Sequence, residues 1–256
     1  SDGLPHVYSY SPQAGAWADK GDVCAASAVV VPVASPYVGA VHPQVAIADT
    51  GIRSYAWAVY DDDTSVTGST VLVTRLEDVR TGAVVVNDRK IATQAPLTFA
   101  HFAMGNYSAT VWGPGPLHLH LIDTTSFVTT AILLPGIPAT LDRFDAAPFT
   151  NDPARFVVAY VDAAAPGTIQ FEERDDTGAV LTSSAILTGG VVASLSVCAR
   201  SGVGKAVIFD AGNGVEGVVY PDPGGGTGVV FDAGATGVRV AGCIDGNGRV
   251  TAVWNG

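Results

Sequence analysis

Three residues that could bind a metal occupy matching places in the sequence. His101, Cys198 and Cys243 each lie eleven residues before the aromatic residue that marks an expected strand. Imidazole and thiolate groups are ligands of zinc and copper. They are weak candidates here, because neighbouring strands usually hold such side chains too far apart and small thiols also pack well between strands. We expect no bound metal and no cofactor.

Acidic residues suggest a second chemistry, the hydrolysis of a glycosidic bond by two carboxylates held roughly 5–9 Å apart. Asp142 and Asp145 are the acidic residues within an expected innermost strand. The chain has no Gly-x-Ser-x-Gly nucleophile motif, and the segment DDDTS at 61–65 lacks the spacing of a calcium loop. The sequence therefore favours a non-enzymatic protein, with a glycoside hydrolase as a disfavoured alternative.

Other histidines, cysteines and aromatic residues give weaker signals. The segment LHLH at 117–120 places His118 and His120 on one face of a strand, and two imidazoles alone make a weak metal site. Cys24, with the two cysteines above, makes an odd number at wide spacing, so no disulfide framework can be deduced. The expected contacts with a ligand or partner are aromatic residues outside the regular strands: Tyr8, Tyr10, Trp17, Tyr37 and Tyr107.

Composition and charge narrow the range of partners. The chain of 256 residues is 48% hydrophobic and 14% charged, which is typical of a globular protein. Its net charge of −11 comes with no basic stripe, so nucleic acid is a poor candidate for a partner. The apolar runs, such as AVVVPVA at 28–34, are too short to span a bilayer, and we expect no membrane insertion.

The elements that must position these residues repeat about every fifty residues, a period typical of arrays of strands. Five apolar strands end in or near an aromatic residue: 55–61, 108–113, 156–162, 205–211 and 249–255, with Tyr60, Trp112, Tyr160, Phe209 and Trp254. Each is preceded by another apolar segment. A third and a fourth strand follow, joined by turns such as 77–82, 123–126, 175–178 and 221–226. In these turns an Asp side chain can bind the backbone two residues later.

Four short strands in each repeat predict a β-propeller. We expect an all-β fold of five four-stranded antiparallel blades in a single domain, covering approximately 42–95, 96–137, 138–188, 189–236, and 237–256 together with 5–35. The last blade would be closed by both ends of the chain, with 6–17 as third strand and turn and 26–34 as fourth strand. A two-sheet sandwich and a fragment of a larger propeller are the alternatives.

The repeat also resembles β-propeller modules in tail proteins of bacterial viruses, including nozzle and tail-tip components. The segments that carry the resemblance are YAWAVYDDD, LEDVRTGAVVV, RFVVAYVDAAAPGTIQFEERDDTGAVL and FDAAPF. The resemblance implies a structural or host-contact module of a virion, located in the virion or outside the cell. The resemblance does not identify any binding or catalytic residue in this chain.

Two functions therefore stay open at this point. The first is a structural or binding module with protein partners in a larger assembly, and the second is a carbohydrate-binding, lectin-like propeller that recognises surface glycans. The loops differ from repeat to repeat, as in DDDTSVTGS and DAGNGVEG, whereas a lectin with one site in every blade should repeat its site residues. The sequence alone thus favours the first function.

Overall fold

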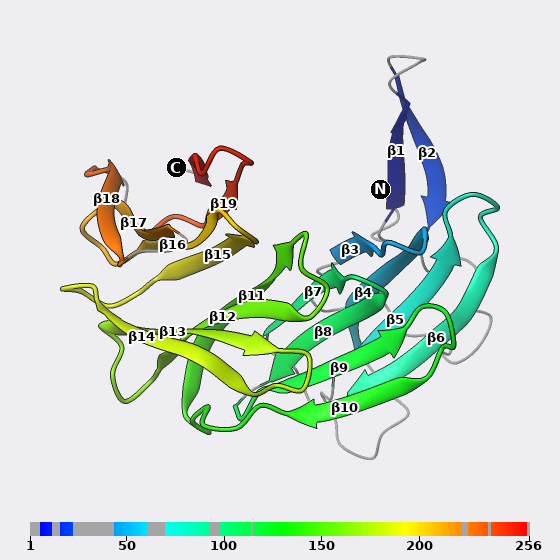
Figure 1. The fold of residues 1–256 in the computed structure, drawn as a ribbon, viewed down its shortest axis with the longest axis horizontal. Helices are drawn as coiled ribbons and strands as arrows, with labels where there is room; N and C mark the ends of the chain where they lie inside the picture. Colours follow the sequence, from blue (N-terminus) through cyan, green and yellow to red (C-terminus); the bar gives the residue numbers. More distant parts are fainter. Residues whose placement is uncertain are drawn as a thin grey trace.

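The computed structural model of the chain describes residues 6–11, 16–22, 44–60, 70–92, 98–113, 115–221, 225–234 and 237–254. These residues form strands and turns, and among them no helix could cross a bilayer. Most strands belong to four consecutive units of four antiparallel strands each, which follow one another along an arc (Figure 1). The fold is therefore all-β and propeller-like.

The bounds of the strands follow the predicted repeat. Unit 1 contains β3 (Gln44–Ile47), β4 (Ile52–Tyr60), β5 (Thr70–Asp78) and β6 (Val84–Ala92). Unit 2 contains β7 (Thr98–Met104), β8 (Tyr107–Gly113), β9 (His118–Asp123) and β10 (Thr129–Leu133). Unit 3 contains β11 (Leu141–Thr150), β12 (Arg155–Asp162), β13 (Thr168–Asp175) and β14 (Val180–Leu187). Unit 4 contains β15 (Ser194–Arg200), β16 (Gly204–Asp210), β17 (Val215–Pro221) and β18 (Thr227–Asp232).

Two further hairpins lie at the ends of the chain. They are β1 (His6–Ser11) with β2 (Ala16–Asp22), and β19 (Val240–Ile244) with β20 (Val250–Trp254). The five predicted aromatic residues all lie in the second strand of a unit or in β20.

Aspartate side chains fix the turns between third and fourth strands, as predicted. Asp78 Oδ1 accepts hydrogen bonds from the backbone N–H groups of Arg80 and Thr81 at 2.8 and 2.9 Å. Asp123 and Asp175 do the same in units 2 and 3. Such a turn reverses the chain within a few residues, so the fourth strand pairs with the third.

The apolar core lies between successive units. One cluster joins units 2 and 3 through residues such as Phe102, Leu119 and Phe156, and another joins units 3 and 4 through residues such as Val157 and Phe209. Consecutive residues of β12 enter these two clusters alternately, because neighbouring side chains in a strand point to opposite faces. A second strand is therefore buried on both faces, which explains its unbroken apolar sequence.

The innermost strands lie next to one another in chain order, from β3 through β7, β11 and β15 to β19. β11 and β15 pair in parallel at Phe149–Ala199 and Thr150–Arg200, so units 3 and 4 form one curled sheet of eight strands. Polar side chains add further links. Gln44 bonds the backbone of Phe99 and His101 in β7, Asp145 accepts from Val197 N in β15, and Ser194 accepts from Val240 N in β19.

The ends of the chain differ from the predicted shared blade. Among the described strands, β1 pairs with β2 and β19 pairs with β20, and no ladder joins the two hairpins. Trp17 lies in β2, opposite Tyr10, rather than in a turn, and the predicted strand 26–34 lies outside the described residues. Pairing 6–11 with 16–22 closes a short loop, whereas pairing it with β20 must bring the two chain ends together, which costs more entropy. The count of five blades is not confirmed.

Candidate ligand-binding site

The three predicted metal ligands occupy innermost strands, but they do not form one cluster. His101 lies in β7, Cys198 in β15 and Cys243 in β19. His101 is buried, and its Nε2 and Nδ1 atoms hydrogen-bond the hydroxyls of Ser54 and Thr110, each at 2.9 Å. Both ring nitrogens are thus used within the protein. Burial lowers the pKa of His101 to about 4, so the ring is neutral near pH 7.

The two cysteines lie on neighbouring strands with different exposure. Cys198 is buried and Cys243 is exposed. Burial, with smaller effects from Cys243 and Asp145, raises the pKa of the Cys198 thiol to about 12 and makes it a poor nucleophile. Within the described ranges, no group of three or more His, Cys, Asp or Glu side chains is placed to hold a metal ion.

The remaining histidines and the acidic residues of β11 also have structural partners. His118 stacks on Trp112 with ring centroids 4.5 Å apart, while His120 is buried, with its pKa lowered to about 4 by burial and by the charge of Arg89. Asp142 pairs with Arg143, and burial raises the pKa of Asp145 to about 6. These two carboxylates contact different groups, Arg143 for Asp142 and the backbone N–H of Val197 for Asp145.

The predicted aromatic contacts can be placed only in part. Tyr107 is half-buried in β8 and packs against the core between units 2 and 3. Tyr8 and Tyr10 lie in β1 and Trp17 lies in β2, but their side chains are outside the described part of the structure, as is Tyr37 altogether. Their role as contacts stays a prediction.

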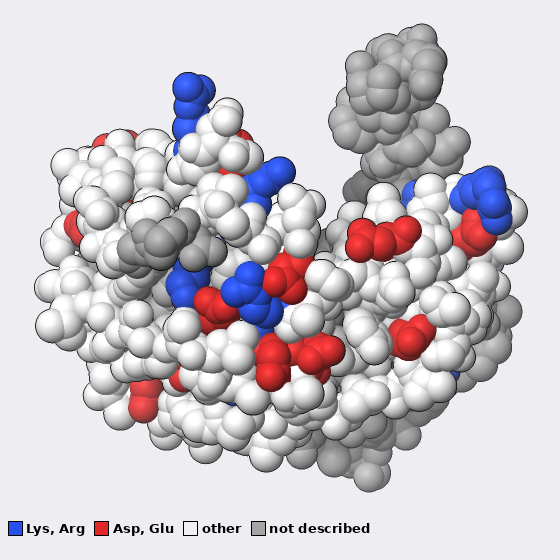
Figure 2. Space-filling view, viewed as in Figure 1, with Lys and Arg blue, Asp and Glu red and all other residues white. Residues whose placement is uncertain are grey.

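Charged side chains gather instead where units 3 and 4 meet. Figure 2 shows acidic and basic groups side by side on this face, surrounded by largely uncharged surface. They border a pocket of about 200 Å³, which we call the inter-unit pocket. Its walls include Phe149, Arg155, Glu173, Thr182, Lys205 and Tyr220.

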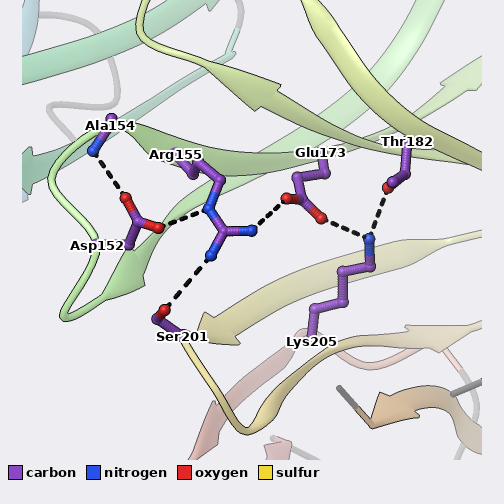
Figure 3. Close-up of polar contacts among 7 residues, drawn as sticks. All are labelled: Asp152, Ala154, Arg155, Glu173, Thr182, Ser201 and Lys205. Atoms are coloured by element: carbon purple, nitrogen blue, oxygen red, sulfur yellow. Dashed lines mark hydrogen bonds and ion pairs between the residues drawn. The ribbon is translucent and has the colours of Figure 1, made fainter. Parts of the chain in front are cut away.

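The polar groups of the inter-unit pocket share one carboxylate (Figure 3). Arg155 from β12 donates to Glu173 Oε1 at 2.7 Å, and Lys205 from β16 donates to Glu173 Oε2 at 3.0 Å. Lys205 also donates to Thr182 Oγ1 of β14 at 2.8 Å. The network thus connects three strands of unit 3 with one strand of unit 4.

A second carboxylate, that of Asp152, also binds Arg155. Asp152, in the turn before β12, accepts from Arg155 Nε at 2.6 Å and from the backbone N–H of Ala154 at 3.0 Å. Burial tends to raise the pKa of Asp152 and of Glu173, but hydrogen bonds and the charges of Arg155 and Lys205 lower both pKa values below their usual range. Both carboxylates are therefore ionised near pH 7.

Aromatic rings line the apolar side of the pocket. The Arg155 guanidinium lies 4.6 Å from the Phe149 ring centroid, and the Lys205 ammonium lies 5.6 Å from that of Phe171. Tyr220 from β17 packs on Phe171 with centroids 5.4 Å apart. The pocket therefore combines fixed hydrogen-bonding groups with an aromatic wall, which is typical of sites for small ligands.

Sequence reasoning missed these residues because they come from distant segments. Their signal was the run FEERDD at 171–176, in which Glu172, Glu173 and Arg174 place three consecutive charged residues within a strand. Charged residues are rarely buried without a partner, so such a run within a predicted internal strand points to a charge network.

Comparisons with known proteins show some structural likeness. No family model matches the chain, and no curated protein matches it. A mutant of AofleA from Arthrobotrys oligospora has a TM-score of 0.49 at 10% identity, over 85% of this chain and 80% of that chain. A neuraminidase-like protein from A/bat/Guatemala/164/2009 has 0.44 at 9% identity, over 74% of this chain and 54% of that chain.

The NanB sialidase of Streptococcus pneumoniae has a TM-score of 0.44 at 12% identity, over 84% of this chain and 38% of that chain. The chain thus spans about half the length of the neuraminidase-like protein and less of the sialidase. The expected link to phage tail proteins is not supported by these comparisons. Likeness at this level gives the chain neither a family nor an activity.

Proposed function

We propose that this chain is a non-catalytic binding module that holds a neutral, polyhydroxylated ligand, such as one sugar residue of a glycan, in the inter-unit pocket. The observation that carries the proposal is the shared carboxylate of Glu173, fixed by Arg155 and Lys205 beside the rings of Phe149 and Tyr220. This arrangement offers a hydroxylated ring an acceptor, two donors and an apolar wall.

Unused hydrogen-bonding capacity supports this function. A carboxylate accepts more hydrogen bonds than the two that Glu173 receives, and an ammonium can donate one more than the two that Lys205 makes. Neighbouring hydroxyls of a sugar can complete both groups at once. Hydrogen bonds to charged groups are roughly twice as strong as neutral ones, so a small pocket can still give measurable affinity.

The charge balance favours a neutral ligand. The positive charges of Arg155 and Lys205 are matched by the negative charges of Glu173 and Asp152. An anionic ligand would have to compete with Glu173 for both cations. A neutral ligand joins the network without breaking an ion pair.

The same charges argue against hydrolysis. A glycosidase requires one carboxylic acid that is protonated at working pH, and its pKa is usually raised. Both carboxylates near this pocket have lowered pKa values instead. Binding without catalysis is therefore the better function for this geometry.

The proposal is tested with a printed glycan array and the matched variants Glu173→Gln and Glu172→Gln. We expect the wild-type chain to bind neutral glycans, and Glu173→Gln to weaken binding at least tenfold in titrations with the best free oligosaccharide. Glu172 is the neighbouring residue on the opposite face of β13, so Glu172→Gln should keep affinity within about twofold in protein that remains folded.

Two results contradict the proposal. One is a wild-type chain that binds no glycan on the array, and the other is a Glu173→Gln variant with unchanged affinity. A preference for sialylated or sulfated glycans would contradict the proposal that the ligand is neutral, but it would agree with the proposal that the ligand is a glycan.

The module is proposed to have five blades, with β19 and β20 as the first two strands of the fifth. Four complete units followed by half of another support this count. A place in a virion or another extracellular assembly stays a prediction, and sequencing of the genes around the coding region tests it.

A further inference from the structure

A second cavity borders the inter-unit pocket. It has a volume of about 310 Å³ and lies where the innermost strands of units 1, 2 and 3 end. Its lining includes Ile47 of β3, Ala103 of β7 and Pro148 of β11, together with the turn that follows β11. We call this cavity the adjoining hollow.

The adjoining hollow combines apolar and polar walls. Ile47 offers apolar surface, since its side chain is 58% exposed. Asp49 and Asn151 are exposed and supply a carboxylate and an amide, which can accept and donate hydrogen bonds. The described residues that line the hollow include no lysine or arginine. This lining suits a neutral polyhydroxylated ring better than an anionic one.

A close approach between units 2 and 3 fixes one wall of the hollow. Gly105, in the turn between β7 and β8, has a φ of +55°, and a Cβ placed there would overlap Pro153. Glycine therefore lets the turn after β11 pack directly on unit 2. Because Pro153 lines the hollow, this wall is formed before any ligand binds, which lowers the entropy that binding costs.

The adjoining hollow and the inter-unit pocket share a wall. Phe149 lines both cavities, and Asp152 of the adjoining hollow pairs with Arg155 of the inter-unit pocket at 2.6 Å. Figure 3 shows the polar groups that run from Asp152 through Arg155 and Glu173 to Lys205. One ion pair thus separates the two cavities, just as one bridging oxygen separates adjacent rings of a glycan.

We propose that the adjoining hollow is a second sugar subsite, so that the protein binds a disaccharide unit of a neutral glycan with one ring in each cavity. The inference rests on the proposed function of the inter-unit pocket and adds the length of the ligand. The inter-unit pocket alone, at about 200 Å³, is smaller than typical ligand sites of about 300–1,000 Å³, whereas the two cavities together fall within that range.

Titration calorimetry with matched sugars tests the second subsite. The probes are cellobiose, maltose, lactose and chitobiose, beside glucose, galactose and N-acetylglucosamine. We expect at least one disaccharide to bind the wild-type chain at least tenfold more tightly than each monosaccharide that composes it. A ring in the second cavity adds hydrogen bonds and apolar contacts that a single ring in the inter-unit pocket does not make.

Two variants remove the polar groups of the adjoining hollow. Asp49→Ala and Asn151→Gly should each weaken binding of the best disaccharide at least threefold and leave monosaccharide affinity within about twofold. Asn151 has a φ of +69°, which glycine adopts readily, so Asn151→Gly removes the amide without straining the turn. Asn247→Gly is the matched control, because Asn247 is exposed in the turn between β19 and β20 and lines neither cavity. It should leave every affinity unchanged.

The outcomes separate the second subsite from the inter-unit pocket. Disaccharides that bind no more tightly than their monosaccharides overturn the second subsite, and so does unchanged disaccharide affinity in both Asp49→Ala and Asn151→Gly. In either case, glycan binding that Glu173→Gln weakens leaves the proposed function in place. A wild-type chain that binds no sugar in titration or on the array overturns both proposals.

Discussion

Glu172 and Glu173 are neighbours in β13 and are both buried, at 7% and 8% exposure, yet they face different units. Glu172 is buried on the face toward unit 2, where it accepts from Tyr160 Oη at 3.1 Å and from Arg174 Nε at 2.9 Å. Arg174 is fully buried and also donates to the backbone oxygens of Gly178 and Pro135. Glu173 faces unit 4 and borders the inter-unit pocket.

The comparison teaches that the type of charge network does not decide its role. Both networks pair a glutamate with an arginine on adjacent positions of one sheet. The network of Glu172 is closed, because its groups bind other protein groups in the core. The network of Glu173 is open on one side, because the pocket gives a ligand access to the same kind of groups. The two networks differ in the exposure of their cations, because the side chain of Arg174 is fully buried whereas those of Arg155 and Lys205 are 29% and 17% exposed.

The largest expected effect comes from opening the closed network. Arg174→Met leaves the Glu172 carboxylate buried without its cation, and removal of one partner of a buried pair costs about 3–5 kcal/mol. Urea unfolding should show this loss. The double variant Glu172→Gln, Arg174→Met removes the stranded charge and should recover part of the stability, and additive losses would contradict the coupling.

Acid should destabilise the core before it affects the pocket. The pKa values of His101 and His120 are lowered to about 4, mainly by burial, so between pH 6.5 and 4 the unfolded chain binds these protons and the folded protein does not. Stability therefore falls as pH drops through this range, and the two histidines together contribute a loss of about 3 kcal/mol between pH 6.5 and 5.

Asp145 opposes this trend, because its pKa is raised to about 6 by burial and protonation below that pH favours the folded state. Glu173 contributes little in this window, since its lowered pKa makes its stabilisation disappear only as pH falls below the usual value. Melting temperatures of the wild type and His101→Gln from pH 7 to 5 check the prediction. Equal slopes in the two proteins would exclude His101 as a source.

The open network should matter less for stability. Glu173→Gln removes ion pairs between a buried carboxylate and the partly exposed cations of Arg155 and Lys205. The loss of stability should therefore lie between the about 0.2–1 kcal/mol of exposed pairs and the about 3–5 kcal/mol of a buried pair. Arg155 keeps Asp152 as a partner. Urea unfolding beside Arg174→Met gives the comparison directly. A loss as large as that of Arg174→Met would assign Glu173 a structural role.

The smallest effect is expected at the rim of the pocket. Thr182→Val removes the hydroxyl that accepts from Lys205, at an exposed position, so stability should change by no more than about 0.5 kcal/mol. Glycan affinity should fall a few-fold, because Lys205 loses the group that orients it. Unchanged affinity in titration would place the ligand away from Thr182.

The sequence was sufficient to predict the four-stranded repeat and its aspartate turns. A second strand buried on both faces must be apolar along its whole length, and a tight turn needs Asp where Asp78, Asp123 and Asp175 stand, so both features leave local patterns. The pairing of 6–11 with 16–22 was not foreseen, because a repeat predicts which strands belong together and says nothing about the cost of joining chain ends.

The pocket could not be located from sequence in the same way. Arg155, Glu173 and Lys205 lie far apart along the chain and meet only because units 3 and 4 face each other across their apolar cluster. The aromatic residues favoured as contacts were chosen for lying outside the repeat. The residues that line the pocket, including Phe149 and Tyr220, lie within the repeat.

The short parallel ladder between β11 and β15 has a consequence for how the molecule comes apart. Backbone hydrogen bonds there run through two units, whereas units 2 and 3 meet through apolar side chains. Amide protons in β11, β12, β15 and β16 should then exchange with deuterium last and together, as one cooperative block. In partial unfolding, units 1 and 2 and the last hairpin would unfold first, and the inter-unit pocket between units 3 and 4 would be lost only at global unfolding.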